Sequence, residues 1–367
     1  MVELSNGCIC CKLREDLLTE VAQIAAQGVF DYLLIESSGI SEPLPVAETF
    51  TFEDSTGLRL GDIAEIDTMV TVVDGSRFMS ELQSLESLQS RDWQADKEDE
   101  RQISHLLCDQ VDFANVIVLN KCDLMEADEQ AQVRQWIAKM NPTADIVQAV
   151  HAAVPLNKIL GTGLFSMSKA EAHPQWLQEA RVGDHVPETV EYGISSFTFR
   201  ALRPFHPERL HVVLEAMARH EAPFERLLRA KGFVWLATRP DLQGDFSLAG
   251  NQYTLVPGNP WWATIDKEHW PVGLAEAMAP LWHEPHGDRQ QEIVLIGQEY
   301  DRAVVEGVLE SALLTEDEMA SSLATAASEQ LVDPFADSWD AAIEAFLSQS
   351  SHDGNHSHDH EHCNHHH

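Results

Sequence analysis

The chain has 367 residues, and its 60 Asp and Glu against 24 Lys and Arg give a formal net charge of −36 at pH 7. The 44% hydrophobic and 23% charged residues are typical of a globular protein and exclude wholesale disorder. The acidity argues against nucleic acid and anionic membranes as partners, and no apolar run reaches the roughly 20 residues that a membrane helix needs. Because no secretory signal opens the sequence, we expect a cytoplasmic protein with reduced thiols.

The first 160 residues alternate short apolar runs with helical patterns, which predicts an α/β domain with a mostly parallel sheet. Helices are expected over 13–26 and 99–107. Strands are expected over 31–36, 68–74 and 115–120, and they end in Glu36, Asp74 and Asn120. Ligands bind at the carboxyl ends of the strands in such sheets, so polar residues there are candidate site residues.

A smaller α+β domain is expected after a linker at 161–190. It covers 191–314 and is followed by an acidic helical extension at 315–350 and a disordered His-rich tail at 351–367. Alternation and periodicity predict its elements. The expected strands cover 194–202, 232–238, 246–256, 261–265 and 292–297, and the expected helices cover 207–219 and 302–314.

The segment Asn120-Lys121-Cys122-Asp123 follows a predicted buried strand. The carboxylate of Asp123 can accept hydrogen bonds from the ring N–H and the exocyclic amine of guanine, a donor pair that adenine lacks. The amide of Asn120 can read the other edge of the base, and the stem of Lys121 can cover the ring. The alternative is a solvated loop after a strand.

A second polar turn, Glu36-Ser37-Ser38-Gly39, also follows a predicted strand. The Glu36 carboxylate can hold a Mg²⁺-bound water, and Gly39 lets the backbone approach a γ-phosphate. The alternative is an ordinary strand-to-loop turn.

Three cysteines, Cys8, Cys10 and Cys11, precede the first predicted helix. A helix N-terminus favours thiolates, which are ligands for Zn²⁺ or Cu(I). Three ligands leave a fourth position open, which suits transfer of the metal better than storage. Three buried apolar cysteines, or a redox dithiol, are the alternatives.

The tail holds eight of the 18 histidines. Neutral imidazole is a good ligand for divalent metals, so the tail can bind several ions loosely. A purification tag is the alternative, but tags are usually unbroken His runs. The candidate ligands are His356, His358, His360, His362 and Cys363.

Four motifs occur in order: Gly-Cys-Ile-Cys-Cys at 7–11, Glu-Ser-Ser-Gly-Ile-Ser-Glu-Pro at 36–43, Val-Val-Asp-Gly at 72–75 and Asn-Lys-Cys-Asp at 120–123. With them the chain resembles the CobW family of P-loop GTPases, in its branch of zinc-regulated GTPase metalloprotein activators. The resemblance implies a GTPase domain over 1–160, a CobW C-terminal domain over 191–314, the cofactors GTP or GDP, Mg²⁺ and Zn²⁺, and a client metalloprotein as partner.

The resemblance implies a role for each residue that matches a functional position of these family motifs. Cys8, Cys10 and Cys11 are the expected metal thiols. Glu36 and Gly39 are the expected switch residues near Mg²⁺ and the γ-phosphate. Asn120, Lys121 and Asp123 are expected to read guanine. Asp74 lies in a family motif but receives no role.

The family also has the motif Gly-x-x-x-x-Gly-Lys-[Ser/Thr], which follows the first strand of the domain. This motif and strand have no counterpart in the 367 residues. That motif supplies the phosphate cradle, its lysine and a Mg²⁺-binding hydroxyl. We therefore expect impaired GTP hydrolysis by these residues alone. A sheet without its first strand is also expected to expose apolar surface, with reduced solubility or added partner contact as the consequence.

Three functions remain open. The first is a GTP-dependent zinc metallochaperone that hands zinc to client metalloproteins. The second is a non-catalytic zinc buffer or scaffold, and the third is a thiol redox protein. The sequence names neither the client nor the fourth ligand, does not choose among Zn²⁺, Co²⁺ and Cu(I), and leaves a homo-oligomer open.

Overall fold

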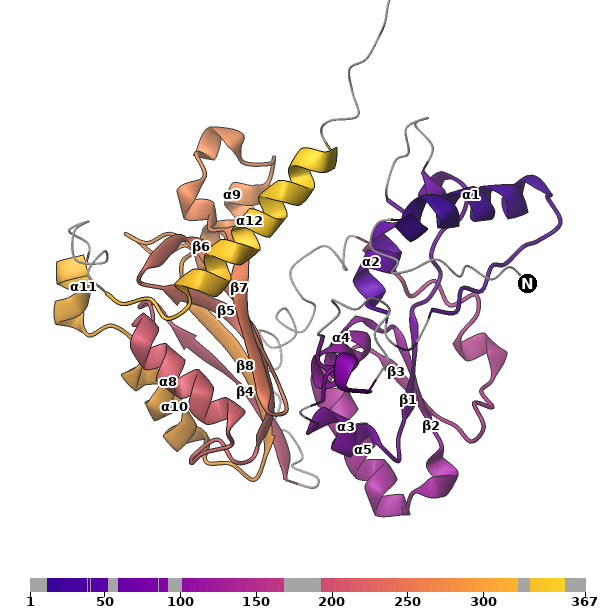
Figure 1. Cartoon of the computed structure of the whole chain (residues 1–367), viewed down its shortest axis with the longest axis horizontal. Coiled ribbons are helices and arrows are strands. Elements are labelled where there is room, and N and C mark those ends of the chain that lie inside the picture. Colours follow the sequence, from indigo (N-terminus) through magenta and orange to yellow (C-terminus); the bar gives the residue numbers. More distant parts are fainter. Residues whose placement is uncertain are drawn as a thin grey trace, which may run out of the picture.

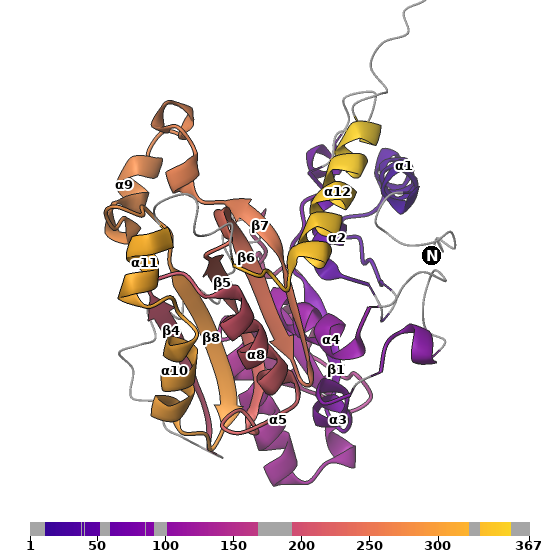
Figure 2. The ribbon, with the colours of Figure 1, turned by 60° about the vertical axis from the view of Figure 1, so that its left-hand side comes forward.

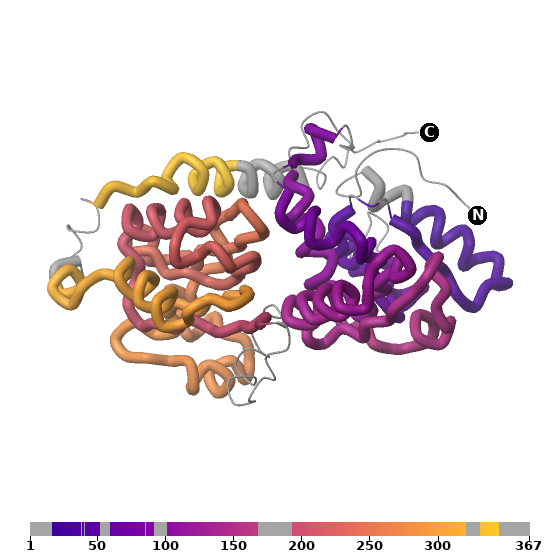
Figure 3. The backbone as a smooth tube through the Cα atoms, turned by 90° about the horizontal axis from the view of Figure 1, so that it is seen from below, coloured from indigo at the N-terminus to yellow at the C-terminus, as the bar shows by residue number. Residues whose placement is uncertain are grey.

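The computed structural model describes residues 12–37, 39, 41–51, 59–84, 86–91, 101–167, 193–322 and 331–353. These residues form two units that lie side by side, each built around its own sheet (Figure 1). The N-terminal unit is drawn from indigo to magenta and the C-terminal unit from pink to yellow. A view from below shows the same arrangement (Figure 3).

The N-terminal unit contains a three-stranded parallel sheet in the order β1-β2-β3. Four of the five residues of the central strand β2 are buried, as expected for a strand in a covered parallel sheet. The parallel α/β sheet expected from the sequence is therefore confirmed. The strands are β1 (Val70–Asp74), β2 (Val116–Asn120) and β3 (Asp145–Gln148).

Three of the helices bury apolar faces against this sheet, with Trp136 and Phe78 among the fully buried side chains, whereas the helix at Lys12–Ala26 packs against Leu60 in a separate apolar cluster. The helix expected over 13–26 is confirmed, whereas the one expected over 99–107 begins later and runs further. The helices are α1 (Lys12–Ala26), α2 (Pro43–Glu48), α3 (Phe78–Leu82), α4 (Ile103–Phe113) and α5 (Ala127–Met140).

The strand expected over 31–36 is wrong: this segment is extended but pairs with no strand in the described part of the chain. Its Leu34 is 78% exposed, and Val72 on the facing edge of β1 is 60% exposed. The apolar pattern is that of a buried strand, but a strand also needs a hydrogen-bonding neighbour. The exposed apolar surface expected for a sheet lacking a strand is therefore present.

The C-terminal unit is a five-stranded antiparallel sheet in the order β4-β8-β5-β6-β7. Side chains alternate between its faces, so Ile293 and Leu295 pack under the helices of this unit while Ile296 packs against the N-terminal unit. Figure 2 shows α8 and α10 on one face of the sheet and the N-terminal unit on the other side. The elements are β4 (Ile194–Ala201), α8 (Pro207–Ala218), β5 (Leu227–Leu236), β6 (Arg239–Ala249), β7 (Gln252–Pro260), α9 (Leu274–Met278), β8 (Gln291–Gln298), α10 (Arg302–Ser311), α11 (Glu316–Ser322) and α12 (Ala336–Asp353).

Two strand predictions in this unit are wrong. The run 246–256 is a hairpin that turns at Gly250, whose φ of 56° favours glycine and where a Cβ would collide with the carbonyl of Leu82. The run 261–265 contains a short 3₁₀ helix, because the backbone N–H groups of Trp262 and Ala263 donate to the Asp288 carboxylate at 3.0 and 2.9 Å.

Candidate guanine-recognition loop and groove

The predicted guanine-reading residues form one loop at the carboxyl end of β2. Lys121 has a positive φ of 61°, which turns the chain out of the strand, and Asp123 follows in a 3₁₀ turn with its side chain exposed. Buried Cys122 anchors the turn, since its thiol donates to the Leu119 carbonyl at 3.2 Å. The carbonyl oxygen of the Asn120 side chain accepts from the Ala152 N–H at 2.8 Å. The loop therefore presents polar side chains from a fixed backbone.

Asp74 is the residue that sequence reasoning left without a role. It lies opposite Asn120 in the β1–β2 register, and its carboxylate forms a 2.7 Å ion pair with the Lys121 ammonium. Burial by itself raises the pKa of Asp74, but hydrogen bonds from Lys121 and Ser76 outweigh it, and the pKa lies below its usual range. The sequence carries a signal for this contact: Asp74 and Asn120 each end a predicted strand, and parallel pairing brings such strand ends together.

Gly75 explains the glycine of the Val-Val-Asp-Gly motif. Its N–H donates to the Asn120 carbonyl at 3.0 Å. A Cβ there would lie 2.6 Å from the Met125 sulfur and 2.9 Å from a Leu119 methyl group. A side chain at position 75 would therefore press on both ends of the candidate guanine-recognition loop at 120–123.

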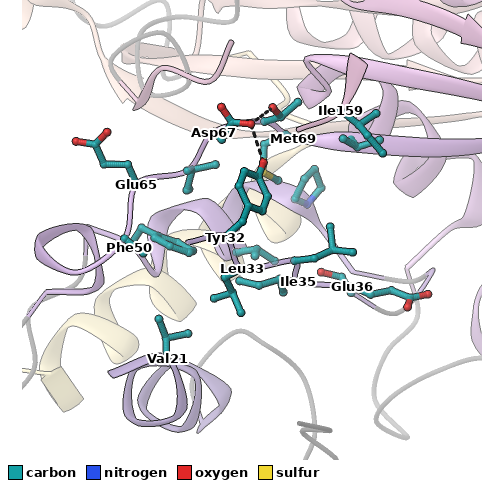
Figure 4. A pocket seen from close by; sticks show the side chains of 18 of the residues that line it. Val21, Tyr32, Leu33, Ile35, Glu36, Phe50, Glu65, Asp67, Met69 and Ile159 are labelled. Carbon is teal, nitrogen blue, oxygen red and sulfur yellow. Dashed lines mark hydrogen bonds between the residues drawn. The ribbon is translucent and has the colours of Figure 1, made fainter. Parts of the chain in front are cut away.

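The predicted switch residues lie elsewhere, along a groove beside β1 (Figure 4). The Glu36 side chain is exposed and makes no hydrogen bond or ion pair with any described residue. The carbonyls of Gly39 and Ser41 accept hydrogen bonds from the Gln110 amide of α4, at 3.0 and 3.1 Å. Ser38 lies outside the described residues. Helix α4 therefore holds the loop that follows Glu36.

We call this hollow the β1 groove. It has a volume of about 920 Å³, and its walls are the extended segment 31–36 on one side and β1 on the other. Glu36 and Gly39 line it, whereas Asn120, Lys121 and Asp123 do not. The structure thus brings together the residues predicted to read guanine, and it places the predicted switch residues along a separate hollow.

A hydrogen-bond cluster around Asp67 was not foreseen. Its carboxylate accepts from the Tyr32 hydroxyl at 2.7 Å, from the Thr68 hydroxyl and from the N–H groups of Thr162 and Gly163. The hydrogen bond from Tyr32 contributes most to holding the pKa of Asp67 far below its usual range. The cluster fastens residues 162 and 163, at the start of the predicted linker, to the N-terminal unit.

The expected metal ligands Cys8, Cys10, Cys11, His356, His358, His360, His362 and Cys363 lie outside the described residues. Within the described ranges, no group of three or more His, Cys, Asp or Glu could hold a metal ion. The described cysteines, Cys108 and Cys122, are buried, and burial raises the pKa of the Cys108 thiol to about 12. A thiol that stays protonated is a poor metal ligand.

Comparison with known proteins decides the family. The family described as CobW/HypB/UreG, nucleotide-binding domain, matches residues 1–148, and the cobalamin synthesis protein cobW C-terminal domain matches residues 194–313. A zinc-regulated GTPase metalloprotein activator 1 of Dictyostelium discoideum is 49% identical over 322 residues, which cover 87% of this chain and 67% of the relative. The chain belongs to the CobW family.

Two further similar proteins share less of their sequence with this chain. A zinc chaperone CobW of Pseudomonas aeruginosa is 27% identical over 85% of this CobW-family chain and 74% of its own length. The solved Zn(II)-bound YjiA GTPase from E. coli is 18% identical, covering 83% of this chain and 78% of that one with a TM-score of 0.33. In the described part of the chain, no helix combines the length and apolar character needed to cross a membrane.

Proposed function

We propose that this CobW-family protein is a GTP-dependent zinc metallochaperone of the cytoplasm, which binds Zn²⁺ at Cys8, Cys10 and Cys11 and transfers it to a client metalloprotein. The observation that carries the proposal is the preorganised loop of Asn120, Lys121 and Asp123. The names of the similar proteins, zinc-regulated GTPase metalloprotein activator and zinc chaperone, support it. GTP hydrolysis is assigned by family resemblance. In this proposal residues 1–160 are the GTPase domain and residues 191–314 the CobW C-terminal domain.

The guanine-recognition loop selects the nucleotide. The exposed Asp123 carboxylate accepts the two donors of guanine, and Lys121 covers the ring while Asp74 limits its side-chain motion at 2.7 Å. Selection rests on an unpaired acceptor, because adenine lacks the two donors that the Asp123 carboxylate would accept from guanine.

The described acidic residues fit Mg²⁺. Mg²⁺ in nucleotide sites is bound by one or two carboxylates, waters and phosphate oxygens, so it needs no cage of protein ligands. The exposed Glu36 carboxylate has no partner among the described residues and can hold a water of the ion. When bound, the ion would neutralise charge on the phosphates. Gln110 orients the neighbouring loop through the Gly39 and Ser41 carbonyls.

Zinc is the cargo in this proposal. Three thiolates leave one position for a ligand of the client, and exchange of thiolates for client ligands moves the ion without redox chemistry. The four histidines and Cys363 named in the tail would collect zinc before it reaches the cysteines.

The test is a titration of fluorescent GTP and ATP analogues into the full chain with Mg²⁺, with and without one equivalent of Zn²⁺. We expect the GTP analogue to bind more tightly than the ATP analogue and to respond to zinc. Asp123→Asn should weaken GTP binding by about tenfold or more, since a hydrogen bond to a charged group contributes about 1.5–3 kcal/mol. Asp128→Asn, an exposed carboxylate on α5, is the control. Zinc binding with no response to GTP would instead identify a zinc buffer.

A further inference from the structure

We propose that Trp270 and Trp282 form a binding site for a methylated ammonium group, and that the ammonium of Lys267 occupies this site until such a ligand displaces it. The group belongs either to a methylated lysine of a partner protein or to a free quaternary ammonium ion. The inference goes beyond the proposed nucleotide and zinc chemistry, because neither assigns a role to this part of the C-terminal unit.

The site lies in a long connection between two strands. Residues 261–290 leave the sheet at the end of β7, pass through three short 3₁₀ turns and α9, and return at the start of β8. Figures 1 and 2 show α9 projecting beyond one end of the C-terminal sheet. Val272 of this connection is the most exposed large apolar side chain among the described residues. Connections much longer than the usual 4–6 residues or so frequently carry function, and this one is open to a partner.

Two indole rings of the connection meet at a corner. The ring planes of Trp270 and Trp282 lie at 65° to each other, and their centroids are 5.5 Å apart. The Nζ atom of Lys267 lies over both rings, 5.0 Å from the Trp282 centroid and 5.7 Å from the Trp270 centroid. Both distances are within the roughly 6 Å over which the face of an aromatic ring attracts a cation. The two rings therefore share one ammonium.

Neighbouring groups hold both rings in place. The indole N–H of Trp270 donates to the Ile265 carbonyl at 3.0 Å, and Trp262 contacts the same ring edge-on with centroids 6.1 Å apart. The indole N–H of Trp282 donates to the Glu284 carboxylate at 2.9 Å. None of these contacts involves the lysine, so the corner keeps its shape when the ammonium leaves. A preformed site loses little conformational entropy when it binds a ligand.

The charges around the corner favour a cation. Because the exposed Glu284 carboxylate accepts a hydrogen bond from Trp282, it polarises the indole and strengthens the negative potential of the ring face. The formal net charge of −36 also raises the concentration of cations near the whole surface. An anionic or neutral polar ligand would gain nothing from two ring faces next to a carboxylate.

The contacts of Lys267 indicate which cation binds best. Its ammonium makes no hydrogen bond or ion pair with any described residue, so the two ring faces are its only partners among them. A plain ammonium is strongly hydrated and loses that hydration on the rings. Methyl groups remove its N–H donors and contact the rings directly, which is why aromatic corners of this kind select methylated ammonium groups. Such a ligand can displace a lysine that is tethered to the site.

The test is NMR spectroscopy of the full chain with isotope-labelled tryptophan, in which Trp270→Phe and Trp282→Phe assign the two indole N–H signals. The ligands are tetramethylammonium chloride and the peptide Gly-Ala-Lys-Ala-Gly with its lysine trimethylated. We expect both ligands to shift the two signals saturably. A peptide in which a neutral tert-butyl group replaces the trimethylammonium keeps the shape without the charge, so it should bind about tenfold more weakly or worse.

Variants of the chain test the role of the lysine. Lys267→Ala removes the competing ammonium, so affinity for the trimethyllysine peptide should rise about threefold or more. Lys158→Ala removes an exposed lysine of the N-terminal unit and is the matched control, which should leave the affinity unchanged. Trp282→Leu keeps an apolar side chain without the ring and should weaken binding about fivefold or more. Circular dichroism and thermal melting show that the variants are folded, and the neutral peptide tests the site without any substitution.

The two ligands distinguish the source of the ammonium group. Binding of the trimethyllysine peptide at least tenfold more tightly than tetramethylammonium identifies a methylated partner protein, and a smaller difference identifies a free ion. Equal binding of the charged and neutral peptides would overturn the proposal. So would an affinity that Lys267→Ala does not raise or Trp282→Leu does not lower, or the absence of saturable shifts. None of these outcomes depends on GTP or zinc, so failure here is distinct from failure of the proposed function.

Discussion

Arg229 of β5 places its guanidinium 2.7 Å from the carboxylate of Asp112 on α4, and this ion pair joins the two units of the protein. The Arg229 side chain is 3% exposed and also donates to the Ser247 hydroxyl and the Leu248 carbonyl. Lys231 adds a second cation at 3.0 Å from Asp112. Because the same helix holds the loop at 39–41 through Gln110, α4 connects the predicted switch loop to the C-terminal sheet.

Removing Asp112 should destabilise the protein strongly. Burial opposes ionisation of Asp112, but Lys231 and Arg229 hold its pKa below its usual range. Asp112→Ala leaves the buried Arg229 without its counter-charge, which costs about 3–5 kcal/mol. Urea unfolding measures the loss. Lys158→Ala breaks an exposed pair with Asp145 and should cost less than about 1 kcal/mol. Similar losses in the two variants would contradict this prediction.

Asp245 should make stability depend on pH. Burial raises its pKa to about 6, and its Oδ1 is buried without a hydrogen-bond partner among the described residues. The folded state therefore favours the protonated acid. Ionisation of the Asp245 carboxyl lowers the free energy of unfolding as the pH rises from about 4 to about 6. Asp245→Asn should stabilise the protein by about 2 kcal/mol at pH 7, with the gain shrinking toward pH 4. Urea unfolding at several pH values checks this. A gain that does not change with pH would point to a cause other than ionisation.

Asp74 should support guanine binding without touching the base. Asp74→Asn removes the charge that holds Lys121, and we expect GTP-analogue affinity to fall several-fold, since a partly exposed ion pair contributes about 1 kcal/mol or less. Asp145→Asn, which removes the partner of Lys158, is the matched control and should leave the affinity unchanged. A loss equal to that of Asp123→Asn would mean that Asp74 contacts the nucleotide itself.

Substitution of two glycines by alanine should change the stability of the protein in opposite directions. At Gly75 the new Cβ meets Met125 and Leu119, and such overpacking costs about 1–3 kcal/mol. At Gly307, inside α10, nothing lies within 4 Å of the new Cβ among the described atoms. Gly307→Ala should stabilise the helix by about 0.5–1 kcal/mol. Thermal melting compares the two, and destabilisation at position 307 would show that the helix has a neighbour there.

The cysteine motif should account for tight zinc binding. In a chain shortened before residue 351, we expect the double variant Cys10→Ser, Cys11→Ser to lose high-affinity Zn²⁺, because one thiolate cannot form a tetrahedral site. Competition with a zinc-binding dye measures the affinity, and Cys108→Ser serves as the control because that thiol is buried. Unchanged high affinity in the double variant would rule out this site. Thiol titration with and without Zn²⁺ separates a metal site from a redox dithiol.

The local sequence predicted those strands, helices and loops whose conformation depends on residues adjacent in the chain. Apolar alternation predicted β4 and β8, and helical periodicity predicted α1 and α8. The contiguous motif at 120–123 predicted that Asn120, Lys121 and Asp123 lie in one loop, because residues that directly follow a buried strand have few conformations open to them. The ordered motifs also predicted the CobW family, which the comparisons confirm.

Tertiary structure alone decided what depends on distant partners. The segment 31–36 has the composition of a strand, yet it pairs with no described strand, because a ladder requires a neighbour that composition does not supply. Asp74 and Lys121 are 47 residues apart, and Arg229 and Asp112 are 117 apart, so only the packing of sheets and helices makes them partners. The sequence by itself thus determined the motifs and most elements, whereas the β1 groove and the link between the units arose from contacts across the fold.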